Sequence, residues 1–152
     1  MPAVAGRLDG KTAIVTGGGS GIGLAAAVRL AQEGAAVTVA EVDDARGREA
    51  LRLIEDAGAK GLFVRTDVSK EADTEAVVRE TVGAFGGLQI LLSNAGIYAP
   101  NDTRITEIDE AVFDQVLNVN LKGMFLSCKY AIPAMVASCV GSVVLTSSIG
   151  AL

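Results

Sequence analysis

A cluster of glycines near the start of the chain is the first feature that could do chemistry. The segment TGGGSGIG places Gly17, Gly21 and Gly23 between a short apolar run and a helical stretch. Glycines in this strand–turn–helix context let the backbone turn tightly and approach a ligand. The free N–H groups at the start of the helix attract phosphate. The segment therefore predicts a loop that binds a pyrophosphate.

An acidic residue, Glu41, ends the second apolar run, 18 residues after Gly23. A carboxylate at this place can accept hydrogen bonds from the ribose hydroxyls of an adenosine, and it would repel a 2′-phosphate. No Arg or Lys lies between Thr12 and Val28 to bind such a phosphate. We therefore expect NAD rather than NADP. The alternative is that Glu41 is a solvated acid of a loop.

Five short apolar runs alternate with helical stretches along the chain. The expected strands are 12–16, 36–41, 61–66, 88–93 and 142–147, and the expected helices are 21–33, 44–57, 70–85 (capped by Ser69) and 107–137. Strands that are apolar on both faces and separated by helices predict a parallel sheet with helices on both sides. We expect one α/β domain over residues 1–152, with a doubly wound sheet in the strand order 3-2-1-4-5.

Polar or glycine residues follow each expected strand. They are Thr16 with Gly17, Glu41, Asp67, Asn94, and Ser147 with Ser148. The carboxyl ends of parallel strands share one edge of the sheet, where open α/β sheets bind ligands. The alternative is that these residues only mark where strands give way to loops. Asp67 would then be a helix-start acid, Gly96 a turn glycine and Ser148 a strand-end hydroxyl.

Five ordered segments together resemble the short-chain dehydrogenase/reductase family, of the classical type. They are TGGGSGIG (16–23), TDVS (66–69), SNAG (93–96), NVNLKG (118–123) and GSVVLTSS (141–148). Departures from the family pattern are Gln89, where an acid is usual, and Ser93, which replaces the first Asn of N-N-A-G; both should mainly affect local hydrogen bonds. The resemblance implies a Rossmann-like NAD(P)-binding domain and hydride transfer between a nicotinamide cofactor and an alcohol or ketone.

The resemblance also implies roles for single residues. Cofactor contacts fall on Gly17, Ser20, Gly21, Ile22, Gly23, Glu41, Asp67, Val68, Asn94, Ala95 and Gly96, and catalytic roles fall on Asn120 and Ser148. Ser148 would hydrogen-bond the substrate oxygen. A backbone carbonyl near Asn120 would hold a water in a proton relay.

Asn120 also has a structural interpretation. It falls in an apolar stripe at helical spacing, formed by Phe113, Val116, Leu117, Met124 and Cys128. A buried amide needs hydrogen-bond partners. Asn120 could therefore tie its helix to the neighbouring strand, serve catalysis, or do both.

The general base of the family is not found in this sequence. The family uses a Tyr followed four residues later by a Lys, shortly after the catalytic Ser, whereas this sequence has four residues after Ser148. The two tyrosines, Tyr98 and Tyr130, are followed four residues later by Asp102 and Ala134. We therefore expect a C-terminally truncated member that lacks the later strands and helices. The alternatives are a non-catalytic dinucleotide-binding module and an inactive fragment.

Composition excludes several other classes of function. The net charge of −5 argues against binding a nucleic acid backbone. The absence of histidine removes His-dependent triads and most zinc sites, so no metal is expected. No apolar run reaches the length of about 18 residues that favours a membrane helix. The first residues do not resemble a secretory signal, so we expect a cytoplasmic protein, with Cys128 and Cys139 reduced and buried.

Two kinds of partner are expected. One is a small-molecule alcohol or carbonyl substrate. The other is a second copy of the chain, because segment 142–147 would lie at the rim of a truncated sheet and recruit other chains. The apolar stretch 112–128, which in relatives is partly buried by a subunit neighbour, points to the same homo-oligomer.

Overall fold

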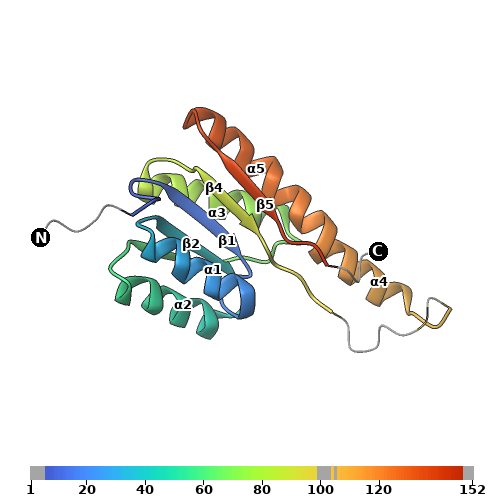
Figure 1. The fold of residues 1–152 in the computed structure, drawn as a ribbon. Helices are drawn as coiled ribbons and strands as arrows, with labels where there is room; N and C mark the ends of the chain where they lie inside the picture. Colours follow the sequence, from blue (N-terminus) through green and yellow to red (C-terminus); the bar gives the residue numbers. More distant parts are fainter. Residues whose placement is uncertain (1–5, 99–103, 105, 149–152) are drawn as a thin grey trace, which may run out of the picture.

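A parallel five-stranded sheet forms the centre of the computed structural model, which describes residues 6–98, 104 and 106–148 (Figure 1). The strands are β1 (Thr12–Thr16), β2 (Ala36–Glu41), β3 (Gly61–Arg65), β4 (Ile90–Ser93) and β5 (Ser142–Leu145). Their order is β3-β2-β1-β4-β5, and every neighbouring pair is parallel. This confirms the predicted doubly wound, Rossmann-like sheet in the order 3-2-1-4-5.

Helices cover both faces of this sheet. Four of them pack on it: α1 (Gly21–Gln32), α2 (Asp44–Asp56), α3 (Glu71–Phe85) and α5 (Gly123–Ala137). The fifth helix, α4 (Glu110–Leu117), has no buried residue and is joined to α5 by a π-helical turn, η1 (Asn118–Lys122). One core joins α1 and α2 to the sheet, and a second core joins α3 and α5 to its other face. The two cores share β1, where Val15 faces the first and Ile14 the second. Burial on both faces explains the uninterrupted apolar sequence of the central strand.

The predicted helix 107–137 is confirmed as a continuous helical segment over 110–137, but it contains a π turn that was not predicted. The structure divides it into α4, the π turn and α5. A π turn holds one residue more than an α-helical turn, so the side chains that follow it shift around the axis. The predicted apolar stripe is not buried as a unit: Phe113 and Leu117 on α4 are exposed, while Cys128 on α5 is half-buried.

Two smaller predictions are also wrong. Ser69 does not cap α3, because the helix begins at Glu71 and the Ser69 hydroxyl donates to Asp67 at 2.6 Å. Cys139 is exposed rather than buried, in a left-handed conformation (φ 58°) just after α5. Both cysteines are free. Other differences are confined to element ends; strand β4, for example, begins at Ile90, although Gln89 just before it already donates its N–H to the Thr12 carbonyl.

The strand β5 forms one rim of the sheet and is exposed throughout. Val143, Val144 and Leu145 are 38%, 51% and 48% exposed. Among the described helices, none has the length and apolar character required to span a membrane. The described residues likewise contain no group of three or more Cys, Asp or Glu side chains arranged to hold a metal ion.

Candidate functional site

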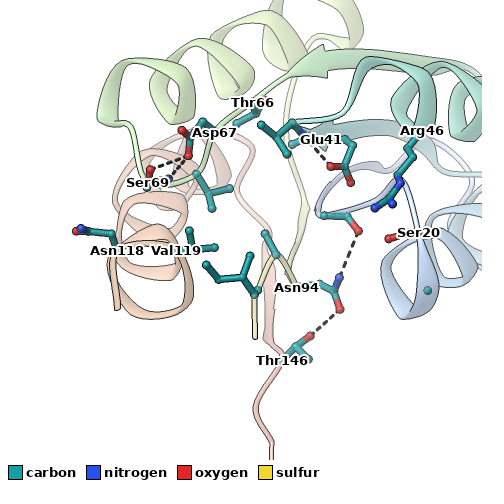
Figure 2. A pocket seen from close by; sticks show the side chains of 18 of the residues that line it. Ser20, Glu41, Arg46, Thr66, Asp67, Ser69, Asn94, Asn118, Val119 and Thr146 are labelled. Atoms are coloured by element: carbon teal, nitrogen blue, oxygen red, sulfur yellow. Dashed lines mark hydrogen bonds between the residues drawn. The ribbon is translucent and has the colours of Figure 1, made fainter. Parts of the chain in front are cut away.

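A pocket of about 910 Å³ lies at the carboxyl edge of the sheet, where the ends of β1 and β4 meet the start of α1. Figure 2 shows Ser20, Glu41 and Arg46 on one side of the pocket, Asp67, Ser69 and Asn118 on the other, and Asn94 between them. All of the predicted cofactor residues except Gly23 line it. The structure therefore brings together residues that are up to 79 positions apart (17 to 96), although their contact with a cofactor stays a prediction.

Two glycines of the first loop are required by the backbone. Gly17 has a positive φ of 63°, and a Cβ there would lie 2.9 Å from the backbone of Ala95. Gly23 does not line the pocket, but a Cβ at this position would overlap the carbonyl oxygen of Gly17. The glycines thus keep the loop tight against β4 and α1, with the amino end of α1 facing the pocket.

Asn94 holds the carboxyl ends of three strands together. Its backbone N–H donates to the Thr16 hydroxyl at 3.0 Å, and its side-chain amide donates to the Gly17 carbonyl at 3.4 Å. The Thr146 hydroxyl in turn donates to Asn94 Oδ1 at 3.3 Å (Figure 2). The sequence analysis missed Thr146, because a hydroxyl one residue past a strand carries no distinctive signal.

Glu41 is buried and accepts hydrogen bonds from three backbone donors. Its Oε2 accepts from Gly19 N–H at 3.1 Å, and its Oε1 accepts from Val42 N–H at 2.9 Å and Asp43 N–H at 3.2 Å. This excludes the alternative of a solvated loop acid. Because a carboxylate offers about four acceptor positions, three backbone bonds leave room for a further donor such as a ribose hydroxyl.

Arg46 is a residue of this site that the sequence analysis missed. It lies in the first turn of α2 and lines the same pocket. A Cβ on Gly19 would lie 2.7 Å from Glu41 Cγ and 2.9 Å from Arg46 Cβ, so both side chains lie directly beside Gly19 of the loop. Arg46 lies outside the segment 12–28 that contains the loop and reaches the pocket from a different element, α2.

Asp67 forms a compact turn before α3. Its Oδ1 accepts from the backbone N–H and the hydroxyl of Ser69, and Lys70 Nζ lies 3.4 Å from Oδ2. Burial opposes ionisation of the carboxyl, but the hydrogen bonds from Ser69 and the Lys70 ammonium outweigh it and lower its pKa. Asp67 therefore shapes this turn as well as lining the pocket.

Asn120 lies in the π turn and binds the segment after β4. Its Oδ1 accepts from Ile97 N–H at 2.8 Å, and its Nδ2 donates to the Ile97 carbonyl at 3.0 Å. This supports the structural interpretation of Asn120, while its catalytic role stays a prediction. Asn120 itself does not line the pocket, but its neighbours Asn118 and Val119 do.

The remaining residues that could take part in proton transfer lie away from the pocket lining. Ser148, the last described residue, is exposed two positions beyond Thr146. The Tyr130 hydroxyl donates to Glu71 Oε1 at 2.6 Å, and this bond raises the pKa of Tyr130. Tyr98 is exposed, and neither tyrosine belongs to the described pocket lining. Tyr130, whose pKa is raised and whose hydroxyl is bound to Glu71, is therefore unsuited to act as a base at this pocket.

Comparison with known proteins agrees with this geometry. The family profile of the short chain dehydrogenases matches residues 11–152. Secoisolariciresinol dehydrogenase of Forsythia intermedia is 38% identical over 149 residues, which cover 98% of this chain and 53% of that protein. The chain thus spans about half the length of the curated relatives it matches.

Solved structures give the same result. Levodione reductase superposes with a TM-score of 0.90 at 35% identity, over 95% of this chain and 56% of that one. Carveol dehydrogenase from Mycobacterium avium, solved in complex with NAD, superposes with a TM-score of 0.91 at 28% identity, over 95% of this chain and 57% of that one. Together with the five sequence segments, these matches establish that the chain belongs to the short-chain dehydrogenase family.

Proposed function

We propose that the chain forms the NAD-binding part of an oxidoreductase that acts on an alcohol or carbonyl compound. The observation that carries the proposal is the buried Glu41 carboxylate, which accepts from Gly19 of the glycine loop and lines the same pocket. Relatives of the chain include dehydrogenases and reductases, two of them solved with NAD, and this supports the same class of activity.

The described residues fit a dinucleotide. Gly17 could not carry a side chain without striking Ala95, so the loop leaves its backbone open at the start of α1. A pyrophosphate there would meet free N–H groups and the positive end of the helix dipole. Glu41 would accept from the ribose, and Asp67 and Val68 would contact the adenine. Asn94, Ala95 and Gly96 would line the path of the nicotinamide ribose.

When bound, the nicotinamide would accept or supply the hydride. The residues of this chain would bind and position the substrate. Ser148 would donate a hydrogen bond to the substrate oxygen, and Asn120 would keep the segment after β4 in place. None of the 152 residues reproduces the Tyr–Lys pair of the family. A positioned acid–base group contributes about 10²–10⁴-fold to rate. We therefore propose that this chain alone binds the cofactor without enzyme-like turnover.

Calorimetric titration of the 152-residue protein with NADH tests both parts of the proposal. The expected result is saturable binding that is lost in Gly17→Val, where the new side chain would occupy the loop. Lys60→Ala, at the opposite edge of the sheet, is the matched control and should bind normally. An absence of NADH binding would refute the proposed function. Steady NADH formation from NAD and a panel of alcohols would favour a complete enzyme instead.

A further inference from the structure

The adenosine side of the pocket contains a base as well as an acid. Among the described residues that line the pocket, Arg46 is the one with a positively charged side chain, whereas Glu41 and Asp67 are negative. Arg46 is 62% exposed, and its Nε lies 3.8 Å from Asp43 Oδ2. At this distance the pair is a loose ion pair rather than a hydrogen bond. The guanidinium is therefore open to a stronger acceptor.

The neighbouring acid is held in place much more firmly. Three backbone N–H groups bind the Glu41 carboxylate, so it cannot turn away from the pocket without leaving them unpaired. The backbone of Arg46 is fixed as well, because its N–H donates to Asp43 Oδ1 at 3.0 Å. The long Arg46 side chain is then the part of this cluster that can reorient.

We propose that Arg46 sets how strongly the site discriminates against a phosphate on the adenosine 2′ oxygen. This inference rests on the proposed binding of a nicotinamide dinucleotide. The 2′ oxygen is the atom that an acid at the end of the second strand recognises, and a nearby Arg can accommodate a 2′-phosphate there. The planar guanidinium binds phosphate with two parallel hydrogen bonds. Arg46 would exchange Asp43 for this phosphate.

The balance of charges gives the direction of the preference. Glu41 and Asp43 carry two negative charges against the single positive charge of Arg46, so the cluster favours the neutral 2′-hydroxyl of NAD. Arg46 offsets much of the repulsion that the acids exert on a 2′-phosphate. The site therefore prefers NAD modestly and still accepts NADP, and loss of Arg46 turns the modest preference into a strong one.

Two adenosine nucleotides isolate this effect from the nicotinamide half. The affinities of 5′-ADP and 2′,5′-ADP are measured by competition against NADH, for the wild type, Arg46→Ala and Arg46→Lys. The matched control is Arg48→Ala, which removes one charge from an exposed position of α2 outside the described lining. All variants are checked for the wild-type unfolding midpoint.

Arg46→Ala should weaken the binding of 2′,5′-ADP by about 5- to 20-fold, because the charge-assisted bond that is lost is exposed and is therefore worth less than a buried one. The same variant should change the affinity for 5′-ADP by less than about twofold, because that nucleotide has no 2′-phosphate for Arg46 to bind. The affinity of Arg46→Lys for 2′,5′-ADP should lie between those of the wild type and Arg46→Ala, since lysine keeps the charge but lacks the planar guanidinium. Arg48→Ala should leave both affinities unchanged.

Three outcomes would overturn the proposal. Equal weakening of both nucleotides by Arg46→Ala would mean that Arg46 covers the adenine or supports the loop. An unchanged ratio of the two affinities would mean that Arg46 does not reach the 2′ position. Failure of the wild type to bind NADH would refute the proposed function together with this inference, and is recognised before any variant is compared.

Discussion

Replacing Glu41 with glutamine tests the link between the second strand and the glycine loop. Glutamine keeps the size and shape of the side chain but exchanges one acceptor oxygen for an NH₂ donor. In the wild type both carboxylate oxygens face backbone donors: Gly19 N–H on one side, and Val42 and Asp43 N–H on the other. Whichever way the amide turns, its NH₂ meets at least one backbone N–H, and that donor loses its partner.

The size of the effect follows from burial. Glu41 is 8% exposed and the Gly19 bond is buried, so water replaces the lost acceptor poorly. A buried donor without a partner costs about 1–3 kcal/mol. Since 1 kcal/mol shifts the midpoint of a domain of this size by about 2–4 °C, Glu41→Gln should unfold about 3–10 °C below the wild type.

Urea and thermal unfolding followed by circular dichroism measure this directly. Glu80→Gln, on the exposed face of α3, is the matched control and should stay within about 0.5 kcal/mol of the wild type. The variant should also bind NADH more weakly, because the loop is no longer held and the charge-assisted acceptor is gone. A Glu41→Gln protein with wild-type stability and wild-type NADH affinity would refute the reasoning, since neither the loop nor the ribose would then depend on the carboxylate.

Two further predictions concern the rim of the sheet and acid stability. The exposed apolar strand β5 should cause self-association, so light scattering should give an apparent mass above one chain that rises with concentration and falls in Val144→Lys; a monodisperse wild-type monomer would contradict this. The lowered pKa of Asp67 means that its contribution to stability is present above the unfolded value of about 4 and is lost as pH falls through the folded value. Between about pH 5 and pH 2.5 the wild type should therefore lose more unfolding free energy than Asp67→Asn, and equal losses would show that Asp67 gains nothing from Ser69 and Lys70.

The sheet could be predicted from the sequence because its strands are buried on both faces. Runs such as 12–16 and 36–41 have no polar alternation, and short runs of this kind between helices point to a parallel arrangement. The π turn could not be predicted in the same way. Its five residues, Asn118–Lys122, differ from an α-helix only in hydrogen-bond pattern, and their types favour neither form.

The site was predictable where backbone geometry demands a residue type. Gly17 and Gly23 are examples, because a side chain at either position would meet the protein backbone. Arg46 and Thr146 were not predictable, because their roles depend on how a helix start and a strand end approach the loop in space. Ser69 misled the cap prediction for a related reason: a capping hydroxyl accepts from a helix N–H, whereas the Ser69 hydroxyl donates to Asp67 and the helix begins two residues later.

The strand order has a consequence for the way the chain is built during synthesis. The central strand β1 emerges first, and β2 and then β3 can each join the outer edge left by the strand before. The strand β4 then joins the other edge of β1, and β5 joins β4 in turn. No strand has to enter between two that are already paired, so the sheet can grow outward in both directions as the ribosome delivers it. The pocket lining includes Asn118 and Val119 of the π turn and Thr146 just after β5, so it is complete only after the last strand has emerged.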